Sequence, residues 1–165
     1  MTLLGELQLK ARYNRWMNER LYAVCAELSD GQRKEFRGAF FGSIHGTFNH
    51  LLLADRVWLG RLTGKPFAAA SLDQELYSDY VELREQRNIT DQDLQAYVAS
   101  LEEPALKQEF QYRNMAGTAK SLPLAMVLSH IFNHQTHHRG QITTLLSQMG
   151  IDPGVTDLIA MPPGK

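Results

Sequence analysis

Residues 130–141 hold four of the six histidines of the chain: His130-Ile131-Phe132-Asn133-His134-Gln135-Thr136-His137-His138-Arg139-Gly140-Gln141. They lie within a longer stretch, 122–149, in which apolar residues recur at alternating steps of four and three, the spacing of a helix face that packs in a core. Two positions in the middle of this face are polar instead, Gln135 and His138. The pattern predicts a long helix, capped by Ser121 and ended by Gly150, whose buried face turns polar at mid-length.

A helical wheel separates the four histidines into two pairs. With about 100° per residue and Ile131 as the zero direction, His138 lies at roughly −20° and His134 at roughly −60°, on or beside the apolar face. His130 and His137 lie at roughly −100° and −120°, toward solvent. His134 and His138 are also one turn apart, so both rings can reach one ion. They form a predicted metal half-site, and the alternative at this spacing is a pair of hydrogen-bonded core histidines.

The same periodicity recurs in three other segments, 2–28, 43–62 and 76–101, which we expect to be helices. Residues 32–42 are expected to be a loop, and 157–160 one further helical turn. Between 102 and 121, Pro104, Gly117 and an alternating stretch at 110–113 indicate an irregular excursion or a small hairpin that can act as a flap. The chain is predicted to be an all-α four-helix bundle with this excursion between its third and fourth helices, forming a single domain over residues 1–165.

The composition is that of an ordinary globular protein, with 44% hydrophobic and 21% charged residues. A formal net charge of −1, without a basic stripe, argues against nucleic-acid binding. The single cysteine, Cys25, excludes a disulfide within the chain, and its position on the apolar face of its helix favours a buried thiol over a reactive one. Charged residues from Glu6 onward interrupt any signal peptide, and no apolar run is long enough to cross a bilayer. We expect a soluble, cytoplasmic protein.

All four predicted helices carry polar residues at a comparable depth, in the middle of their apolar faces. These residues are Asn14 and Asn18, then Asp55, then Arg87 and Thr90, and finally Gln135 and His138. Buried asparagines can simply fix the register of a helix. A whole polar layer, however, is costly unless its members satisfy one another or an ion, and bundle cores commonly hold metal sites. The coincidence favours a metal site.

A third ligand is expected from the second helix, which contains His45 and His50. His50 shares its flank with small or apolar residues, whereas His45 lies near Arg56 and is expected to be at the surface or in contact with a loop. The wheel therefore favours His50, although only weakly, because this helix is apolar nearly all round.

Two segments are similar to the DinB family of small bacterial four-helix bundles, named for damage-inducible proteins and related to YfiT-like proteins. They are Thr47-Phe48-Asn49-His50-Leu51-Leu52-Leu53-Ala54-Asp55-Arg56-Val57-Trp58 and His134-Gln135-Thr136-His137-His138-Arg139-Gly140-Gln141. Segments 13–18 and 112–117 also match, so the resemblance spans nearly the whole chain. It implies that His50, His134 and His138 are the metal ligands and that the protein forms a homodimer. Many family members have no assigned reaction, and some relatives are transferases or isomerases that use low-molecular-weight thiols.

Three neutral imidazoles would leave a divalent ion with its full charge and an open coordination position, where a water or a thiol is made more acidic. Imidazole ligands suit zinc, nickel, iron and copper, and of these we expect zinc or nickel, with iron and copper as alternatives. The second ring nitrogens need partners, for which Asn14, Asn18, Asp55 and Gln135 are candidates. Arg87, or Arg113 in the excursion, is a candidate for holding an anionic substrate.

The helix motif of zinc proteases is excluded, because it needs a glutamate after the first histidine and this chain has Gln135. Asp55 is the one carboxylate that we expect near the polar layer, either as a general base or as a residue that orients a ligand. Three hypotheses follow. A metal-dependent enzyme, either a small-molecule hydrolase or a thiol-dependent transferase, requires a solvent-reachable site beside the ion. A non-catalytic, stress-linked metal-binding protein requires a fourth protein ligand. A dimeric interaction protein requires no ion. We favour the first.

Overall fold

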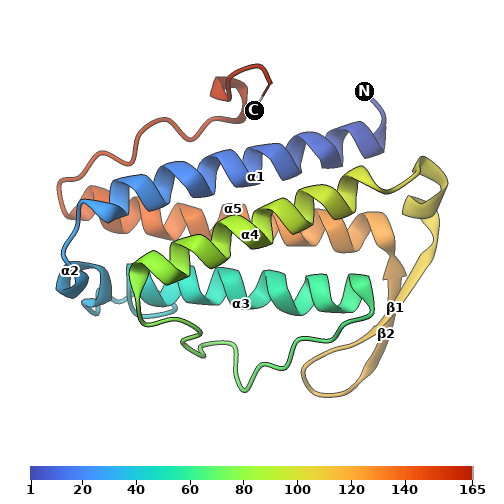
Figure 1. The fold of residues 1–165 in the computed structure, drawn as a ribbon, viewed down its shortest axis with the longest axis horizontal. Helices are drawn as coiled ribbons and strands as arrows, with labels where there is room; N and C mark the ends of the chain where they lie inside the picture. The colour runs from blue at the N-terminus through green and yellow to red at the C-terminus, as the bar shows by residue number, and fades with distance from the viewer. Residues whose placement is uncertain (165) are drawn as a thin grey trace.

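The computed structural model describes residues 1–164, and its framework is four long helices: α1 (Leu3–Ala26), α3 (Ile44–Thr63), α4 (Tyr80–Ala99) and α5 (Leu124–Gln148). Figure 1 shows these helices side by side, with their axes roughly aligned. The shorter elements are helix α2 (Asp30–Lys34), the 3-10 helices η1 (Glu103–Lys107) and η2 (Leu158–Ala160), and strands β1 (Glu109–Arg113) and β2 (Ala119–Pro123). The predicted four-helix bundle is confirmed, as is the helical turn near the C-terminus.

The neighbours of each helix define the order of the bundle. α1 packs against α4 and α5, and α3 packs against the same two helices, so α1 lies diagonally across from α3. α3 and α5, which carry His50 and the 130–141 segment, are therefore adjacent. None of the helices in residues 1–164 has the length and hydropathy to cross a membrane.

The core consists of two apolar clusters with a polar layer between them. One cluster packs around Met17, Leu21, Phe48, Leu83 and Ile142. The other packs around Leu7, Leu94, Val98, Leu128 and Ile131. On every long helix the residues between the two clusters include buried polar side chains, among them Asn14, Asp55, Arg87 and Gln135. The polar layer expected from the interrupted apolar faces is confirmed at the predicted depth.

The excursion between α4 and α5 is a hairpin, the second of the two predicted forms. β1 pairs with β2 antiparallel, with Phe110 opposite Leu122 and Gln111 opposite Ser121. The predicted cap of α5 at Ser121 is wrong, because β2 runs directly into the helix and Pro123 precedes it without a capping side chain. The backbone N–H of Leu124 instead donates to the carbonyl of Gln108, 3.0 Å away. This bond joins the start of α5 to the residue before β1.

Two other boundaries differ from the prediction. α4 begins at Tyr80, with Asp79 as its cap, and not at 76. Although Leu76 has the helix spacing, its backbone N–H and that of Tyr77 donate to Asn49 Oδ1 on α3, at 2.8 and 3.0 Å. Residues 30–34, on the edge of the predicted loop, form α2, whose first turn is closed by a reciprocal capping pair of Ser29 and Gln32.

Candidate metal centre

Three histidines from two adjacent helices converge on one point. His50 lies on α3, while His134 and His138 lie one turn apart on α5, and one ring nitrogen from each lies within 4.8 Å of the others. The Nε2 atoms of His50 and His134 are 3.0 Å apart. Two nitrogens bound to one tetrahedral zinc at its usual bond length would be separated by about 3.3 Å. The spacing of these two rings therefore fits a shared ion.

Hydrogen bonds select the nitrogen that two of these rings present. His50 Nδ1 lies 2.8 Å from the carbonyl oxygen of Leu72, and His138 Nδ1 lies 2.7 Å from Oε1 of Gln141. A carbonyl oxygen only accepts, so each Nδ1 carries the proton and donates. In a neutral ring, this leaves the Nε2 lone pair free. Both histidines are thus held in the tautomer that a metal ion needs, with the second nitrogen engaged as in known metal sites.

The cluster is largely shielded from water, which keeps its rings neutral. His50 is 4% exposed and His138 is 7% exposed, and His134 is half-buried. Burial lowers the pKa of His50 to about 4 and the pKa of His134 to about 3. For His134, repulsion from the neighbouring rings lowers the pKa further. At neutral pH the three imidazoles therefore offer lone pairs and carry no charge.

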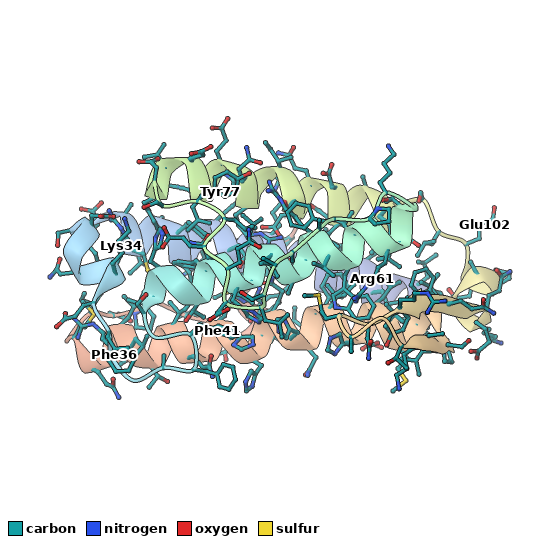
Figure 2. All side chains as sticks on the ribbon, turned by 90° about the horizontal axis from the view of Figure 1, so that it is seen from below. Lys34, Phe36, Phe41, Arg61, Tyr77 and Glu102 are labelled. Carbon is teal, nitrogen blue, oxygen red and sulfur yellow. The ribbon has the colours of Figure 1, made fainter. Side chains whose placement is uncertain are left out.

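Phe41 covers one side of the cluster. Its ring stacks on His50 with the centroids 3.6 Å apart and the planes 14° from parallel, and it meets His138 edge-on at 5.4 Å. Figure 2 shows Phe41 where α3 and α5 face one another. Phe41 was not among the predicted site residues, because it lies in the loop before α3, where no helical spacing indicates its direction. It fixes the plane of the His50 ring and excludes water from that side.

The other two histidines of α5 lie outside the cluster, as the wheel predicts. His130 and His137 are exposed, and their rings lie 5.8 Å from His134 and 4.8 Å from His138. His130 also packs against Trp58, which in turn packs against Tyr112 of the hairpin. Within residues 1–164, no fourth histidine, cysteine, aspartate or glutamate joins the three ligands. An ion held here would keep a coordination position free of these side chains.

The polar layer is a separate network beside the cluster. Arg87 Nη2 lies 2.8 Å from Asp55 and 2.7 Å from Asp91, so the layer contains a second carboxylate besides the expected Asp55. Asn14 and Asn18 both donate to Asp91, and Gln135 donates to Asp55 at 2.7 Å. Burial raises the pKa of Asp55 to about 6. Two carboxylates and the guanidinium of Arg87, from α3 and α4, thus form a buried ionic network, which amide side chains extend to α1 and α5, while Asp55 Oδ1 and Arg87 Nε keep no hydrogen-bond partner in the described residues.

The residues predicted to orient the ligands form this layer instead of contacting the ligands. In residues 1–164, neither Nδ1 bond of His50 or His138 involves Asn14, Asn18, Asp55, Arg87 or Gln135. The wheel predicts the side of the helix and the depth at which these residues lie, but not their partners. In the structure each of them contacts a charged group of the layer and not a neutral ring. Gln141, the partner that was missed, is i+3 from His138 and was recognisable by that spacing. Leu72 contributes a backbone carbonyl, for which the sequence carries no signal.

Arg87 is buried and engaged by two carboxylates, and Arg113 donates to the carbonyl of Gly117 in its own hairpin, so neither faces the cluster. His45 is also buried and not at the surface. Its Nε2 contacts the Tyr77 carbonyl at 3.0 Å, which confirms the predicted loop contact.

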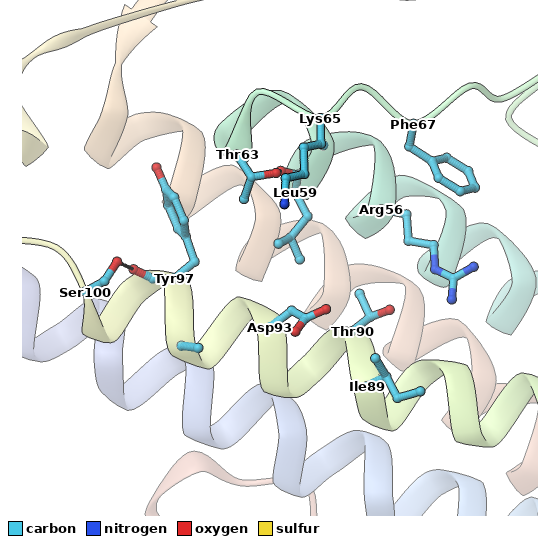
Figure 3. A pocket seen from close by; sticks show the side chains of 12 residues that line it. Arg56, Leu59, Thr63, Lys65, Phe67, Ile89, Thr90, Asp93, Tyr97 and Ser100 are labelled. Atoms are coloured by element: carbon cyan, nitrogen blue, oxygen red, sulfur yellow. Dashed lines mark hydrogen bonds between the residues drawn. The ribbon is translucent and has the colours of Figure 1, made fainter.

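A cavity of about 640 Å³ lies between α3 and α4, and Figure 3 shows Arg56, Lys65, Asp93 and Tyr97 around it. None of the three clustered histidines lines it. This cavity is therefore separate from the histidine cluster.

Comparisons with known proteins agree on one group. The model of the DinB family matches residues 4–163. The chain is 28% identical over 149 residues to protein DinB of Bacillus subtilis (strain 168), a match that covers 88% of this chain and 87% of that protein. The crystal structure of a DinB-like protein from Bacillus cereus ATCC 10987 superposes with a TM-score of 0.63 at 20% identity, covering 84% of this chain and 90% of the other. At that identity, the structural match supports the fold.

Proposed function

This chain belongs to the DinB family, and on that premise we propose that it is a divalent-metal-binding protein that acts as a metal-dependent enzyme on small molecules. The ligands are His50, His134 and His138, and zinc or nickel is the expected ion, with iron and copper as alternatives. The proposed reaction is the transfer of a low-molecular-weight thiol to an electrophile. Hydrolysis of a small molecule is the other reaction considered.

One observation carries the proposal. Two of the three rings are held by Nδ1 hydrogen bonds in the tautomer that presents Nε2, and no fourth histidine, cysteine or carboxylate in the described residues closes the site. A closed four-ligand set is typical of structural metal sites, whereas three protein ligands with an open position are typical of catalytic ones. The geometry therefore favours an enzyme over a purely structural ion.

The surrounding residues favour a thiol over water as the nucleophile. A divalent ion with three neutral ligands keeps its charge and would lower the pKa of a bound water or thiol. Hydrolysis usually needs a carboxylate or histidine base beside the water, and Asp55 is bound to Arg87 and Gln135. In a thiol transfer, the sulfur bonds to the electrophilic carbon, the bond from that carbon to its leaving group breaks, and the thiol proton passes to a base. A thiol bound to the ion would release that proton to solvent water, because the ion stabilises the thiolate, and would therefore need no protein base.

The experiment on metal binding uses protein purified without a histidine tag, measured by elemental analysis. His138→Ala should remove stoichiometric metal, because two ligands cannot hold the ion with the open position intact. His137→Ala, a neighbouring ring outside the cluster, is the matched control and should retain nearly all the metal. Equal loss from both variants would show that the ligand assignment is incorrect.

The reaction is tested with the metal-loaded protein, using cysteine and glutathione as thiols and chlorodinitrobenzene as the electrophile. We expect the rate of thiol conjugation to exceed the uncatalysed rate and to fall to it in His138→Ala. A rate that is the same with and without protein, together with hydrolysis of activated esters by the same metal-loaded protein, would favour the hydrolase. A homodimer is also proposed, from the family resemblance, and light scattering of the purified chain measures it.

A further inference from the structure

A second cavity, of about 280 Å³, lies between α1 and α5 and is separate from the histidine cluster. Its walls include Lys10 and Tyr13 from α1, Phe132, Thr136 and Arg139 from α5, and Leu158 from η2. None of the three clustered histidines lines it. Arg139 follows His138 in sequence but lies about 100° further around the helix. The two sites therefore occupy different flanks of α5.

Arg139 is a buried cation with neutral neighbours. Its side chain is 4% exposed, and it donates from Nη1 to the oxygens of Asn14 and Gln135 and from Nη2 to Thr136 Oγ1, 3.3 Å away. Unlike Arg87, it has no carboxylate within ion-pair distance among residues 1–164. Buried carboxylates reach it only through amide side chains: Asp91 through Asn14 and Asn18, and Asp55 through Gln135. Buried charges normally contact a counter-ion directly.

The cavity side of this guanidinium has spare hydrogen-bonding capacity. Thr136, the partner of Nη2, and Asn14, a partner of Nη1, both line the cavity together with Arg139 itself. An arginine has five N–H donors, and the hydrogen bonds within residues 1–164 give the Nε–H and the second N–H of Nη2 no acceptor. These two adjacent donors form the fork that binds a carboxylate in a bidentate manner.

Besides the polar side chains of Ser129 and Asn133, the remaining walls combine a second positive charge with apolar surface, which favours a small anion. No aspartate or glutamate lines the cavity, and Lys10 adds a second cation at its exposed side, where it also pairs with Glu6. Phe132 and Leu158 supply apolar surface. A volume of 280 Å³ lies near the lower end of the range for small-molecule pockets, which begins at about 300 Å³. This combination suits a small carboxylic acid.

The C-terminal tail covers this cavity. Figure 1 shows the tail after α5 turning back and running along α1. The hydroxyl of Tyr13 donates to the carbonyl of Thr156, and Leu158 forms part of the wall. The tail therefore encloses a space that would otherwise be an open groove between the two helices.

We propose that the cavity between α1 and α5 is a binding site for a small carboxylate, with Arg139 as its bidentate partner and the C-terminal tail as its cover. This site does not depend on the proposed metal chemistry. Binding should require a negative charge on the ligand and an unfilled cavity, and it should persist without metal.

The test is calorimetric titration of the full chain, after chelation of metal, with benzoate and with its neutral counterpart benzamide. Benzoate should bind about tenfold or more tightly than benzamide, the discrimination expected of a charge-assisted bidentate pair. Arg139→Gln should abolish this preference. Because Arg139 also bonds to the polar layer, Asn133→Phe provides a second variant, in which an exposed lining residue is enlarged to fill the cavity and Arg139 is retained. It should weaken benzoate binding at least tenfold.

Two controls locate the binding. Val81→Phe places the same ring at an exposed position of α4 that does not line this cavity, and should leave benzoate binding unchanged. His138→Ala removes a proposed metal ligand and should also leave it unchanged. Equal binding of benzoate and benzamide, binding that survives Asn133→Phe, or binding that is lost on chelation or in His138→Ala would each overturn the proposal.

Discussion

The polar layer and the histidine cluster lie side by side in the bundle, and both interrupt apolar helix faces, but their polar groups are satisfied in opposite ways. In the layer, donors meet acceptors: Arg87 lies between Asp55 and Asp91. In the cluster, ring nitrogens face ring nitrogens: Nε2 of His50 lies 3.0 Å from Nε2 of His134, and one nitrogen from each of the three rings lies within 4.8 Å of the others. His134 and Gln135 are adjacent in sequence, yet one belongs to each region. A polar residue on a buried helix face thus acquires its role from what faces it.

The largest expected effect is a loss of stability when the polar layer is disrupted, while the histidine cluster still binds metal. Arg87→Met removes the cation between two buried carboxylates and should lower the free energy of unfolding by about 3–5 kcal/mol, because an unpaired buried charge remains. The folded fraction should still bind metal, since Arg87 does not contact the histidines. Denaturant titration and elemental analysis measure the two quantities. Arg84→Met, one turn earlier on α4 and only half-buried, should change stability by less than about 0.5 kcal/mol. If both variants lost equal stability, the ion pairs of Arg87 with Asp55 and Asp91 would not be what stabilises the layer.

A smaller effect is expected from a substitution in the histidine cluster, which should weaken metal binding and leave the stability nearly unchanged. Gln141→Leu removes the acceptor that holds His138 Nδ1–H and should weaken metal binding by about 10–100-fold, the usual effect of losing a partner of a ligand ring. Its effect on the stability of the metal-free protein should be slight. Competition with a chelating dye gives the affinity. Gln148→Leu, at an exposed position of α5 without a ring contact, should bind metal like the unaltered chain, and a similar weakening there would contradict the role of Gln141.

The smallest effect concerns pH and the metal-free protein. Burial lowers the pKa of His50 to about 4 and that of His134 to about 3, from the usual histidine pKa of about 6.5. As the pH falls below 6.5, the unfolded chain therefore binds protons that the native rings do not, and the free energy of unfolding decreases. The melting temperature after chelation should fall between pH 7 and pH 4.5, and His134→Ala should reduce this dependence. An unchanged pH dependence in that variant, equal to that of His137→Ala, would show that the cluster is not shielded as described.

Helical spacing predicts much of this fold because the same positions that carry the apolar face also mark its interruptions. The depth of the polar layer follows from Asn14, Arg87 and Gln135 occupying regular positions on their helices. The start of α4 does not follow, because Leu76 keeps the spacing while Asn49, from another helix, holds its backbone in a loop. Spacing reports which side of a helix a residue faces, and a competing tertiary hydrogen bond leaves no trace in it.

The candidate site is predictable from the sequence to a similar extent. The wheel selects His134 and His138 because their direction is fixed by their own helix. Their surroundings come from elsewhere: Phe41 lies in a loop and Leu72 contributes a backbone carbonyl, and neither has a periodic pattern. Helical spacing also does not indicate the charge of the nearest neighbour. It therefore predicts that Asp55 and Gln135 hold the rings, whereas in the structure Asp55 contacts the guanidinium of Arg87 and Gln135 accepts from that of Arg139. Prediction of the partners requires the three-dimensional structure.

The bond from His50 Nδ1 to the Leu72 carbonyl joins the proposed metal centre to the connection over residues 64–79, which contains neither helix nor strand. Asn49, the residue before His50, accepts from the backbone of Leu76 and Tyr77 in the same connection. Asn49 and His50, which are adjacent on α3, thus fix both the loop and the ring that the loop supports. Insertions or deletions in this connection, which most surface loops tolerate, would here be transmitted to the orientation of an imidazole, so its length is constrained by coordination geometry and not by folding alone.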